Sequence, residues 1–510
     1  LSDQAAQAES IKEWSSASEL WYQLLLRDRT NSGVRERYRF CLRRAQQVNR
    51  FHDESYRQQI VSLSLDAAIQ VYGEVLAKLH TDYVDQDKVR LPLLFKHGLE
   101  ELQFALEEAF FCQTFAQELP SDVIRAFGQE LQNWAKKSVK RPADAQGIAR
   151  DIALAAQKSL GLKPSLVVLE LACGACVGLD ECTYYLTPSQ FNELNASLKG
   201  ETVGVGAEVV KPEQELVVSY VAPRSPASQM LKKGDRILRI GNRQTPTLTA
   251  EEAADLLKGA PETTVELEVR GLDAKSHVYK LRRQVVRLPS VSTPGFLPDP
   301  VRPASMPDPD QRIGYLQLFA FQENTIEELN EAIAKLQAEG MRALVLDLRG
   351  NPGGLFDVAR QVVERFVATG VIVSTQGRVA GEFNTTYHAH GSSVLDVPLV
   401  VLVDGETASS AEMVAGALKD HLRGRLVGKT TFGKGSIQKV RPLHSMPAGI
   451  RMTVARFYSP NHQSYDEQGV APQLEVDRVN RNMELDSQVQ AAAEIARSLL
   501  MRPMNAGGID

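Results

Sequence analysis

Apolar residues recur at helical spacing through the first third of the chain, to about residue 160. The clearest positions are Leu20, Trp21, Leu24 and Leu25, followed by Ile69, Tyr72, Val75, Leu76 and Leu79. An apolar stripe that repeats every three or four residues is typical of helices that bury one face. The pattern predicts an N-terminal helical extension (residues 1–60), with a helix hairpin over residues 18–47, and a helical domain (residues 61–200).

From about residue 201 the pattern changes to short apolar runs bounded by Gly, Pro and Asn. The runs at residues 216–221, 236–240 and 264–270 predict strands, and residues 250–257 predict a short helix. So many short elements close together predict a small separate domain over residues 201–287. The proline-rich stretch that follows, residues 288–311, predicts a linker or a surface excursion.

After residue 312 strands and helices alternate. Three apolar runs predict strands, two of them buried on both faces: residues 314–321, 343–348 and 397–404. A helix is expected over residues 325–339, opened by a capping box between Thr325 and Glu328. The pattern predicts an α/β domain over residues 312–480, followed by a C-terminal helix and tail (residues 481–510). The chain as a whole is therefore an α/β multidomain protein.

Charge and hydropathy exclude some classes of protein. The chain has 58 basic and 63 acidic residues, a net charge of −5, without a block of like charges, which argues against a nucleic-acid partner. No apolar run reaches the roughly 18 residues of a transmembrane segment. The first residues lack the pattern of a signal peptide, and a leucine at position 1 suggests a trimmed chain.

The five cysteines are sparse and odd in number, which argues against a disulfide scaffold. Cys173, Cys176 and Cys182 lie close enough in sequence to ligate a metal. A fourth ligand is not apparent nearby, and structural zinc normally takes four. We therefore favour buried thiols or a single disulfide for these three residues. The other two cysteines are Cys41 and Cys112.

Ser409 lies where a buried strand gives way to a helix. The strand ends at Asp404, a tight turn follows, and the helix begins near Ser409. The positive end of a helix, with its unpaired N–H groups, favours a developing oxyanion. The alternative is that Ser409 or Ser410 only caps the helix.

A serine nucleophile needs a base, because its hydroxyl is unreactive at neutral pH. His421 lies one helix further on, and the chain has no Gly-x-Ser-x-Gly elbow. Lys434, between two glycines, is the better candidate, provided that desolvation lowers its pKa. If its segment is a strand, Gln438 shares its face and orients the amine. The alternative is that Lys434 is an exposed turn residue.

A glycine-rich loop follows another buried strand at residues 350–354, with the sequence Gly-Asn-Pro-Gly-Gly. Its backbone N–H groups suit an oxyanion hole or a phosphate cradle. No Gly-Lys-Ser/Thr follows, so it is not a Walker A motif.

Taken together, these three segments resemble the C-terminal processing peptidases, also called tail-specific proteases. Ser409, Lys434 and Gln438 hold the spacing of that family's Ser-Lys dyad and its glutamine, and Asp420 falls on a family aspartate that we expect to be structural. Further matching segments are residues 72–85, 179–188, 203–206, 231–238 and 452–476. Residues 1–60 and much of 95–165 lie outside the family pattern. Ser410 is a minor rival nucleophile, and Glu181-Cys182-Thr183 replaces the family's Pro-His-Ser.

The resemblance implies a serine endopeptidase with a crotonase-like ββα-spiral protease core and an inserted PDZ domain. It makes Ser409 the nucleophile, Lys434 the base and Gln438 its orienting partner. The oxyanion hole would use Ser410 with Gly353 or Gly354. The peptide-binding loop of the PDZ domain would be Val203, Gly204, Val205 and Gly206. The family uses no metal and no cofactor.

The expected partners are protein or peptide substrates, held by their C-termini. We also expect the N-terminal helices to bind a second copy of the chain or an adaptor protein. The usual location of the family suggests the periplasm or cell envelope. Two other functions compete: an inert PDZ-and-helix scaffold, and an acyl-CoA enzyme of the crotonase type.

Overall fold

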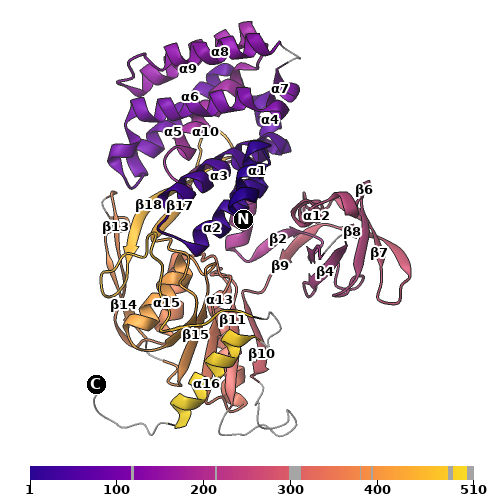
Figure 1. The fold of residues 1–510 in the computed structure, drawn as a ribbon, viewed down its shortest axis with the longest axis vertical. Coiled ribbons are helices and arrows are strands. Elements are labelled where there is room, and N and C mark those ends of the chain that lie inside the picture. The colour runs from indigo at the N-terminus through magenta and orange to yellow at the C-terminus, as the bar shows by residue number, and fades with distance from the viewer. Residues whose placement is uncertain are drawn as a thin grey trace.

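The computed structural model describes residues 1–116, 120–212, 215–297, 312–379, 381–391, 394–479 and 486–501. Figure 1 shows a helical part at one end of the long axis and an α/β core at the other. A small β-sheet domain projects from the side between them.

The helical part occupies the stretch where the apolar spacing predicts helices. Its helices are α1 (Ser2–Ser10), α2 (Trp14–Arg27), α3 (Ser32–His52), α4 (Glu54–Ser62), α5 (Leu65–Asp82), α6 (Leu91–Glu107), α7 (Ala109–Phe115), α8 (Ser121–Trp134), α9 (Pro142–Leu160) and α10 (Pro164–Val177). Helix α10 is buried on all sides from Ser165 to Cys176, and α5, α6 and α9 pack around it. The first three helices have a small apolar core of their own, built on Trp21.

The lateral domain is an antiparallel sheet with one helix. Its strands are β3 (Ala207–Val210), β4 (Leu216–Val221), β5 (Arg236–Ile240), β6 (Arg243–Gln244), β7 (Thr264–Arg270) and β8 (Ser276–Arg282), with α12 (Ala250–Leu257) beside β3. The sheet has an apolar cluster separate from that of the core. A two-stranded ribbon of β2 (Glu201–Gly204) and β9 (Gln284–Arg287) leads into and out of it. The three strands and the helix expected here have the bounds that the sequence predicts.

The α/β core contains a six-stranded sheet in the order β10-β11-β12-β15-β16-β19. The strands are β10 (Val291–Phe296), β11 (Ile313–Leu318), β12 (Ala343–Asp347), β15 (Leu399–Val403), β16 (Arg425–Gly428) and β19 (Leu474–Glu475). All neighbours are parallel except β10 and β11. Helices α13 (Thr325–Ala338), α14 (Phe356–Glu364) and α15 (Ser410–Asp420) pack on one face of this sheet, and α16 (Ser487–Met501) covers the other.

A second sheet of the core is antiparallel. It consists of β1 (Tyr184–Leu186), β13 (Thr369–Gly377), β14 (Thr386–His390), β17 (Ser436–Pro442) and β18 (Gly449–Tyr458). Strand β1 pairs with β18, so a segment assigned to the helical domain from sequence contributes a strand to the core. A short helix, α11 (Pro188–Leu198), then leads to the lateral domain.

Two expectations are wrong in this region. The predicted linker is a strand over part of its length, β10, which pairs with β11; residues 298–311 lie outside the described residues. The predicted capping box also does not form: Asn324, not Thr325, occupies the N-cap position, and it makes no side-chain cap hydrogen bond. The Glu328 carboxylate instead accepts hydrogen bonds from Ser290 N, Ser290 Oγ and Val291 N at 2.8, 2.7 and 3.1 Å, and so fixes the entry to β10.

Within the described residues, no single helix is long and apolar enough to cross a membrane. The pair of α4 and α5, bent by 120°, meets the criteria of length and composition only when the two are taken together.

Candidate active site

Ser409 lies between the end of strand β15 and the first turn of helix α15. Its backbone has φ +57° and ψ −120°, an unfavourable conformation for a residue with a side chain. Such strain costs about 1–3 kcal/mol and persists where the surroundings enforce it, which is common at active sites. The neighbouring Ser410 is buried, and its hydroxyl donates to the carbonyl of Gly354 at 3.0 Å. Ser410 is therefore engaged in a structural contact, which leaves Ser409 as the better candidate for the nucleophile.

The glycine-rich loop packs directly on Ser409. A Cβ atom on Gly353 would lie 2.9 Å from the Cβ atom of Ser409 and 3.0 Å from the N atom of Ser410. A Cβ atom on Gly354 would lie 2.2 Å from the carbonyl oxygen of Phe321. Both glycines have positive φ, so they provide conformation as well as space.

The two glycines differ in the use of their N–H groups. Gly353 N donates to Asn351 Oδ1 at 2.8 Å, and the Asn351 amide in turn donates to the carbonyl of Leu318 at 2.7 Å. Asn351 thus fixes the loop and occupies the N–H of Gly353. Of the alternatives raised by the sequence, Gly354 is therefore the better donor to pair with Ser410 in an oxyanion hole.

The carboxylate of Glu412, fully buried in the first turn of α15, connects the two halves of the site. Its Oε2 accepts from Ser409 N and from Lys434 N, each at 2.8 Å, and its Oε1 accepts from Gly433 N and Thr431 Oγ1, each at 2.6 Å. Burial raises the pKa of Glu412, and these donors oppose the rise. One carboxylate thus fixes the backbone of both proposed dyad residues.

Lys434 follows strand β16 in a loop that ends at strand β17. Burial lowers the pKa of its ammonium group, as a general base requires. Cys182 and Asp180, from the loop before β1, oppose this shift, and Arg451 of β18 reinforces it. Cys182 is thus one of the groups that act on the charge of the Lys434 side chain. Lys434 is therefore not the exposed turn lysine of the alternative interpretation.

Gln438 does not reach Lys434 through a shared strand face. Strand β17 begins only at Ser436, and its pairing is irregular between Ile437 and Gln438. The Gln438 amide donates to Ser436 Oγ at 2.9 Å and to Thr453 Oγ1 at 3.4 Å. The orienting role of Gln438 thus stays a prediction.

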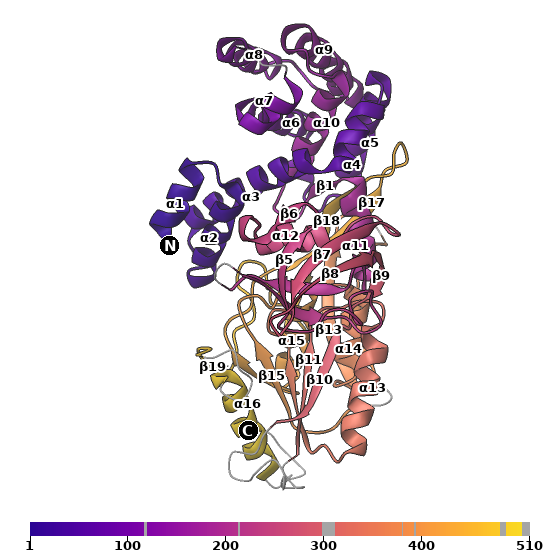
Figure 2. The same ribbon diagram turned by 90° about the vertical axis from the view of Figure 1, so that its right-hand side faces the viewer.

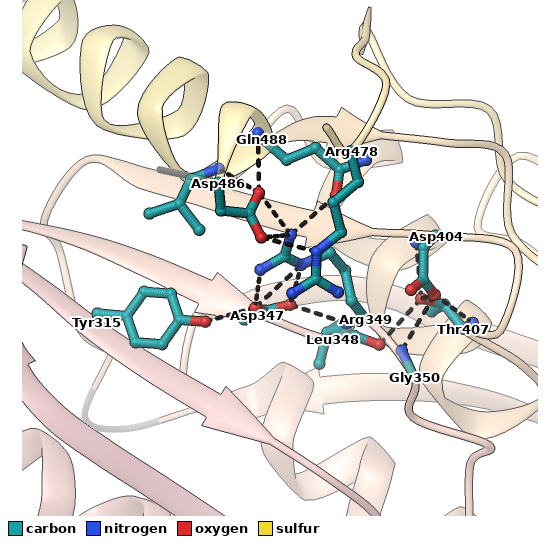
Figure 3. A network of polar contacts seen from close by, with 11 residues as sticks. Tyr315, Asp347, Leu348, Arg349, Gly350, Asp404, Thr407, Arg478, Asp486 and Gln488 are labelled. Carbon is teal, nitrogen blue, oxygen red and sulfur yellow. Dashed lines mark hydrogen bonds and ion pairs between the residues drawn. The ribbon is translucent and has the colours of Figure 1, made fainter. Parts of the chain in front are cut away.

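A buried ion-pair network supports the glycine-rich loop from behind (Figure 3). Arg349 Nη2 lies 2.6 Å from Asp347 Oδ2, and Arg349 Nη1 lies 2.9 Å from Asp486 Oδ2. Asp347 also accepts from the hydroxyl of Tyr315, and Asp486 from Arg478 Nε at 2.8 Å. Two carboxylates and two guanidinium groups balance in charge. Because Asp486 immediately precedes α16, the C-terminal helix is tied to the loop beside Ser409.

The lateral domain presents a cavity of about 1040 Å³ between α11, β3 and the end of α12. Its lining includes the four residues predicted to bind peptide, Val203, Gly204, Val205 and Gly206. Val203 and Gly204 belong to the β2–β9 ribbon, whereas Val205 and Gly206 lie in the turn before β3. Strand β3 is at the edge of its sheet, so the cavity adjoins unpaired backbone groups that a peptide strand can use.

The cysteines do not form a metal cluster. All five are free thiols; Cys173 and Cys176 are buried in α10, and Cys182 lies beside Lys434. Among the residues that the structure describes, no group of three or more His, Cys, Asp and Glu side chains is placed to hold a metal.

Sequence reasoning missed Glu412, Asn351 and Cys182. Glu412 stands three residues after Ser409, the spacing of a capping box, and this signal could have identified it. Cys182 could not be found in this way, because only the pairing of β1 with β18 brings it to Lys434.

Two segments of the chain match models of known protein families. Residues 312–476 match the model of peptidase family S41, and residues 190–270 match that of the PDZ domain. A carboxyl-terminal-processing protease of Synechocystis is 36% identical over 309 residues, which cover 59% of this chain and 69% of that protein. A second such protease, from Picosynechococcus, is 35% identical over 327 residues, 62% of this chain and 75% of that protein.

Among solved structures, the photosystem II D1 C-terminal processing protease is 26% identical, with a TM-score of 0.43, over 85% of this chain and 97% of that one. The extent of the Synechocystis match decides the assignment. The chain belongs to the carboxyl-terminal-processing protease family and is a serine-type C-terminal processing peptidase with a PDZ domain.

Proposed function

We propose that this protein is an endopeptidase that binds C-terminal or unfolded segments of proteins and cleaves them with Ser409 as nucleophile. Neutral Lys434 takes the proton of the Ser409 hydroxyl as its oxygen attacks the scissile carbonyl. The N–H groups of Ser410 and of Gly354 (or Gly353) stabilise the oxyanion. The amine product leaves with a proton from Lys434, and water then releases the acyl group.

The observation that carries this proposal is the strained backbone of Ser409, held at the N-terminus of α15 against Gly353. A serine that only caps a helix normally has an extended backbone and needs no such strain. The lowered pKa of Lys434 gives the second half of the dyad.

Substrate recognition by the PDZ domain belongs to the same proposal. A C-terminal peptide would add to the edge of β3 in the cavity beside α12, and the turn at Val205 and Gly206 would hold its carboxylate. Val205 N already donates to the carbonyl of Leu257 at 3.3 Å. Gly206, with φ +79°, is therefore the better carboxylate donor of the two.

The proposal also includes expectations that go further than the family assignment. They include the crotonase-like core, the domain boundaries given above, a periplasmic or cell-envelope location, and a second copy or an adaptor at the N-terminal helices. Relatives from Tetradesmus and Arabidopsis are named chloroplastic peptidases. The acyl-CoA alternative is disfavoured by the family assignment.

The test is cleavage of an unfolded protein with an apolar C-terminus by wild type, Ser409→Ala and Ser410→Ala. We expect cleavage by wild type and by Ser410→Ala, which keeps its backbone N–H, and none by Ser409→Ala. Cleavage by Ser409→Ala would contradict the proposal. Peptide binding without cleavage by wild type would favour the scaffold function.

A further inference from the structure

The connection between α2 and α3 lies against the loops that carry the two proposed dyad residues. In Figure 1, and in the view turned by 90° in Figure 2, the α2–α3 pair runs from the helical part toward the core. Arg29, in this connection, donates from its guanidinium to the carbonyl of Thr430 at 2.9 Å and to the carbonyl of Phe432. These two carbonyls flank Thr431, whose hydroxyl binds Glu412. Arg29 thus holds the Lys434 loop from outside, and Glu412 holds it from inside.

Other residues of the hairpin reinforce this contact. The ring of Tyr22 packs on that of Phe432 with centroids 5.7 Å apart, and Arg35 pairs with Glu467 at 3.4 Å. Glu467 N in turn donates to the carbonyl of Gly433 at 2.8 Å. The hairpin therefore contacts the Lys434 loop directly and also through the segment packed behind it.

The nucleophile loop is also within reach of the hairpin. A Cβ atom on Gly405 would lie 3.4 Å from side-chain atoms of both Arg29 and Leu26. Gly405 belongs to the turn between β15 and Ser409. The hairpin tip thus bridges the two loops whose relative position sets the distance between nucleophile and base.

The hairpin is anchored independently of the core. At the far end of α3, the buried Arg50 pairs with Glu101 of α6 at 3.2 Å and with Glu170 of α10 at 2.8 Å. Buried pairs of this kind are costly to break. The tip is therefore presented to the core by the helical part, and residues 1–52 lie outside both segments matched by family models.

We propose that the α2–α3 hairpin is a built-in activating element and that Arg29 is a positioning residue for Lys434. The inference rests on the proposed dyad and goes beyond it, because it assigns part of the catalytic geometry to the N-terminal extension. Docking of the hairpin keeps the Thr430–Lys434 backbone at the distance from Ser409 that proton transfer requires. An undocked hairpin leaves the dyad residues present but poorly aligned.

The experiment compares full-length Arg29→Ala with Arg27→Ala, which removes the same charge from an exposed position of the same hairpin. Arg29→Ala is expected to lower kcat by about tenfold or more, the factor that loss of a hydrogen bond to a charged group represents, with KM little changed. Added guanidinium ion, below denaturing concentration, is expected to restore part of the lost kcat. Arg27→Ala should behave as wild type and show no rescue.

A second readout does not depend on activity. Hydrogen exchange of the amides of residues 430–435 is expected to be about tenfold faster or more in Arg29→Ala than in Arg27→Ala, since a held backbone opens less often. Equal exchange and equal kcat in the two variants would overturn the inference, as would faster exchange without loss of kcat. Lack of cleavage by wild type, combined with faster exchange in Arg29→Ala, would instead count against the proposed protease activity and leave the hairpin contact established.

Discussion

The backbone N–H groups of Ser409 and Lys434 donate to the same oxygen atom, Oε2 of Glu412, each at 2.8 Å. Two loops that follow different strands of the sheet are thereby fixed to one buried point. The distance between the proposed nucleophile and the proposed base then depends on one carboxylate more than on the flexibility of either loop. This explains why a buried acid that takes no part in bond making is found in the first turn of α15.

Replacement of Glu412 by glutamine should therefore damage both activity and stability. A glutamine presents one oxygen and one NH2 group to four donors, and each donor left unpaired costs about 1–3 kcal/mol. A misplacement of about 1 Å can lower the rate about a hundredfold. Thermal unfolding and kcat/KM measure the two effects, with the exposed Glu406→Gln as control. Full activity of Glu412→Gln would contradict the inference that Glu412 fixes the positions of Ser409 and Lys434.

The pH dependence should follow the lowered pKa of Lys434. Below that pKa the ammonium form dominates and cannot accept the Ser409 proton, so kcat/KM rises with pH and levels off above it. The inflection should lie below the ordinary lysine value of 10.5. By the same linkage, stability should increase with pH between the folded pKa and 10.5, because the unfolded state binds the additional proton.

The neighbours of Lys434 should move this inflection in opposite directions. Cys182 raises the pKa of Lys434, so Cys182→Ala should shift the inflection to lower pH; Arg451 lowers it, so Arg451→Gln should shift it to higher pH. The profile of log kcat/KM against pH for the three proteins measures both shifts. Two shifts of the same sign would contradict this assignment of the base.

Gly354 should tolerate no side chain. Its Cβ would lie 2.2 Å from the carbonyl oxygen of Phe321, at a φ of +142°. Gly354→Ala should therefore displace the loop from Ser409 and abolish most cleavage. Gly241→Ala is the matched control, because Gly241 also has positive φ but open space around it. That variant should lose only about 1–2 kcal/mol of stability and keep its activity.

The network behind the loop predicts a stability effect. Asp486→Asn leaves the buried Arg349 short of a charge partner, which should cost about 3–5 kcal/mol. Asp357→Asn removes an exposed pair with Arg360 and should cost about 0–1 kcal/mol. Denaturant unfolding compares the two, and equal stability would show that α16 is not tied to the loop through Arg349.

The sequence predicts local elements well where one physical signal dominates. Residues 264–270 form a strand because alternate positions bury Val265, Leu267 and Val269, and residues 343–347 form one because every side chain is buried. Strand β10 escaped prediction because Pro294 and Gly295 suggest a loop. Both are tolerated there, since β10 lies at the sheet edge and its pairing is irregular at this point.

The residues of the candidate site also differ in how well the sequence predicts them. Ser409 and Lys434 could be proposed because each stands in a local pattern, a helix start and a glycine-flanked loop, and because their spacing resembles that of a known family. Cys182 and Arg29 could not, because they reach Lys434 and its loop only through contacts between segments distant in sequence. For Thr325 and Glu328 the local signal was misleading, since Ser290 takes the carboxylate that a capping box would use.

The most direct test of the account is the mass and location of a covalent adduct with a peptidyl phosphonate that mimics the acyl-transfer transition state. If Ser409 is the nucleophile, wild type should carry one adduct, on Ser409. Ser409→Ala should carry none, and labelling should be much slower in Lys434→Ala than in the control Lys429→Ala. An adduct on another residue, or labelling of Lys434→Ala at the wild-type rate, would contradict the Ser409–Lys434 dyad.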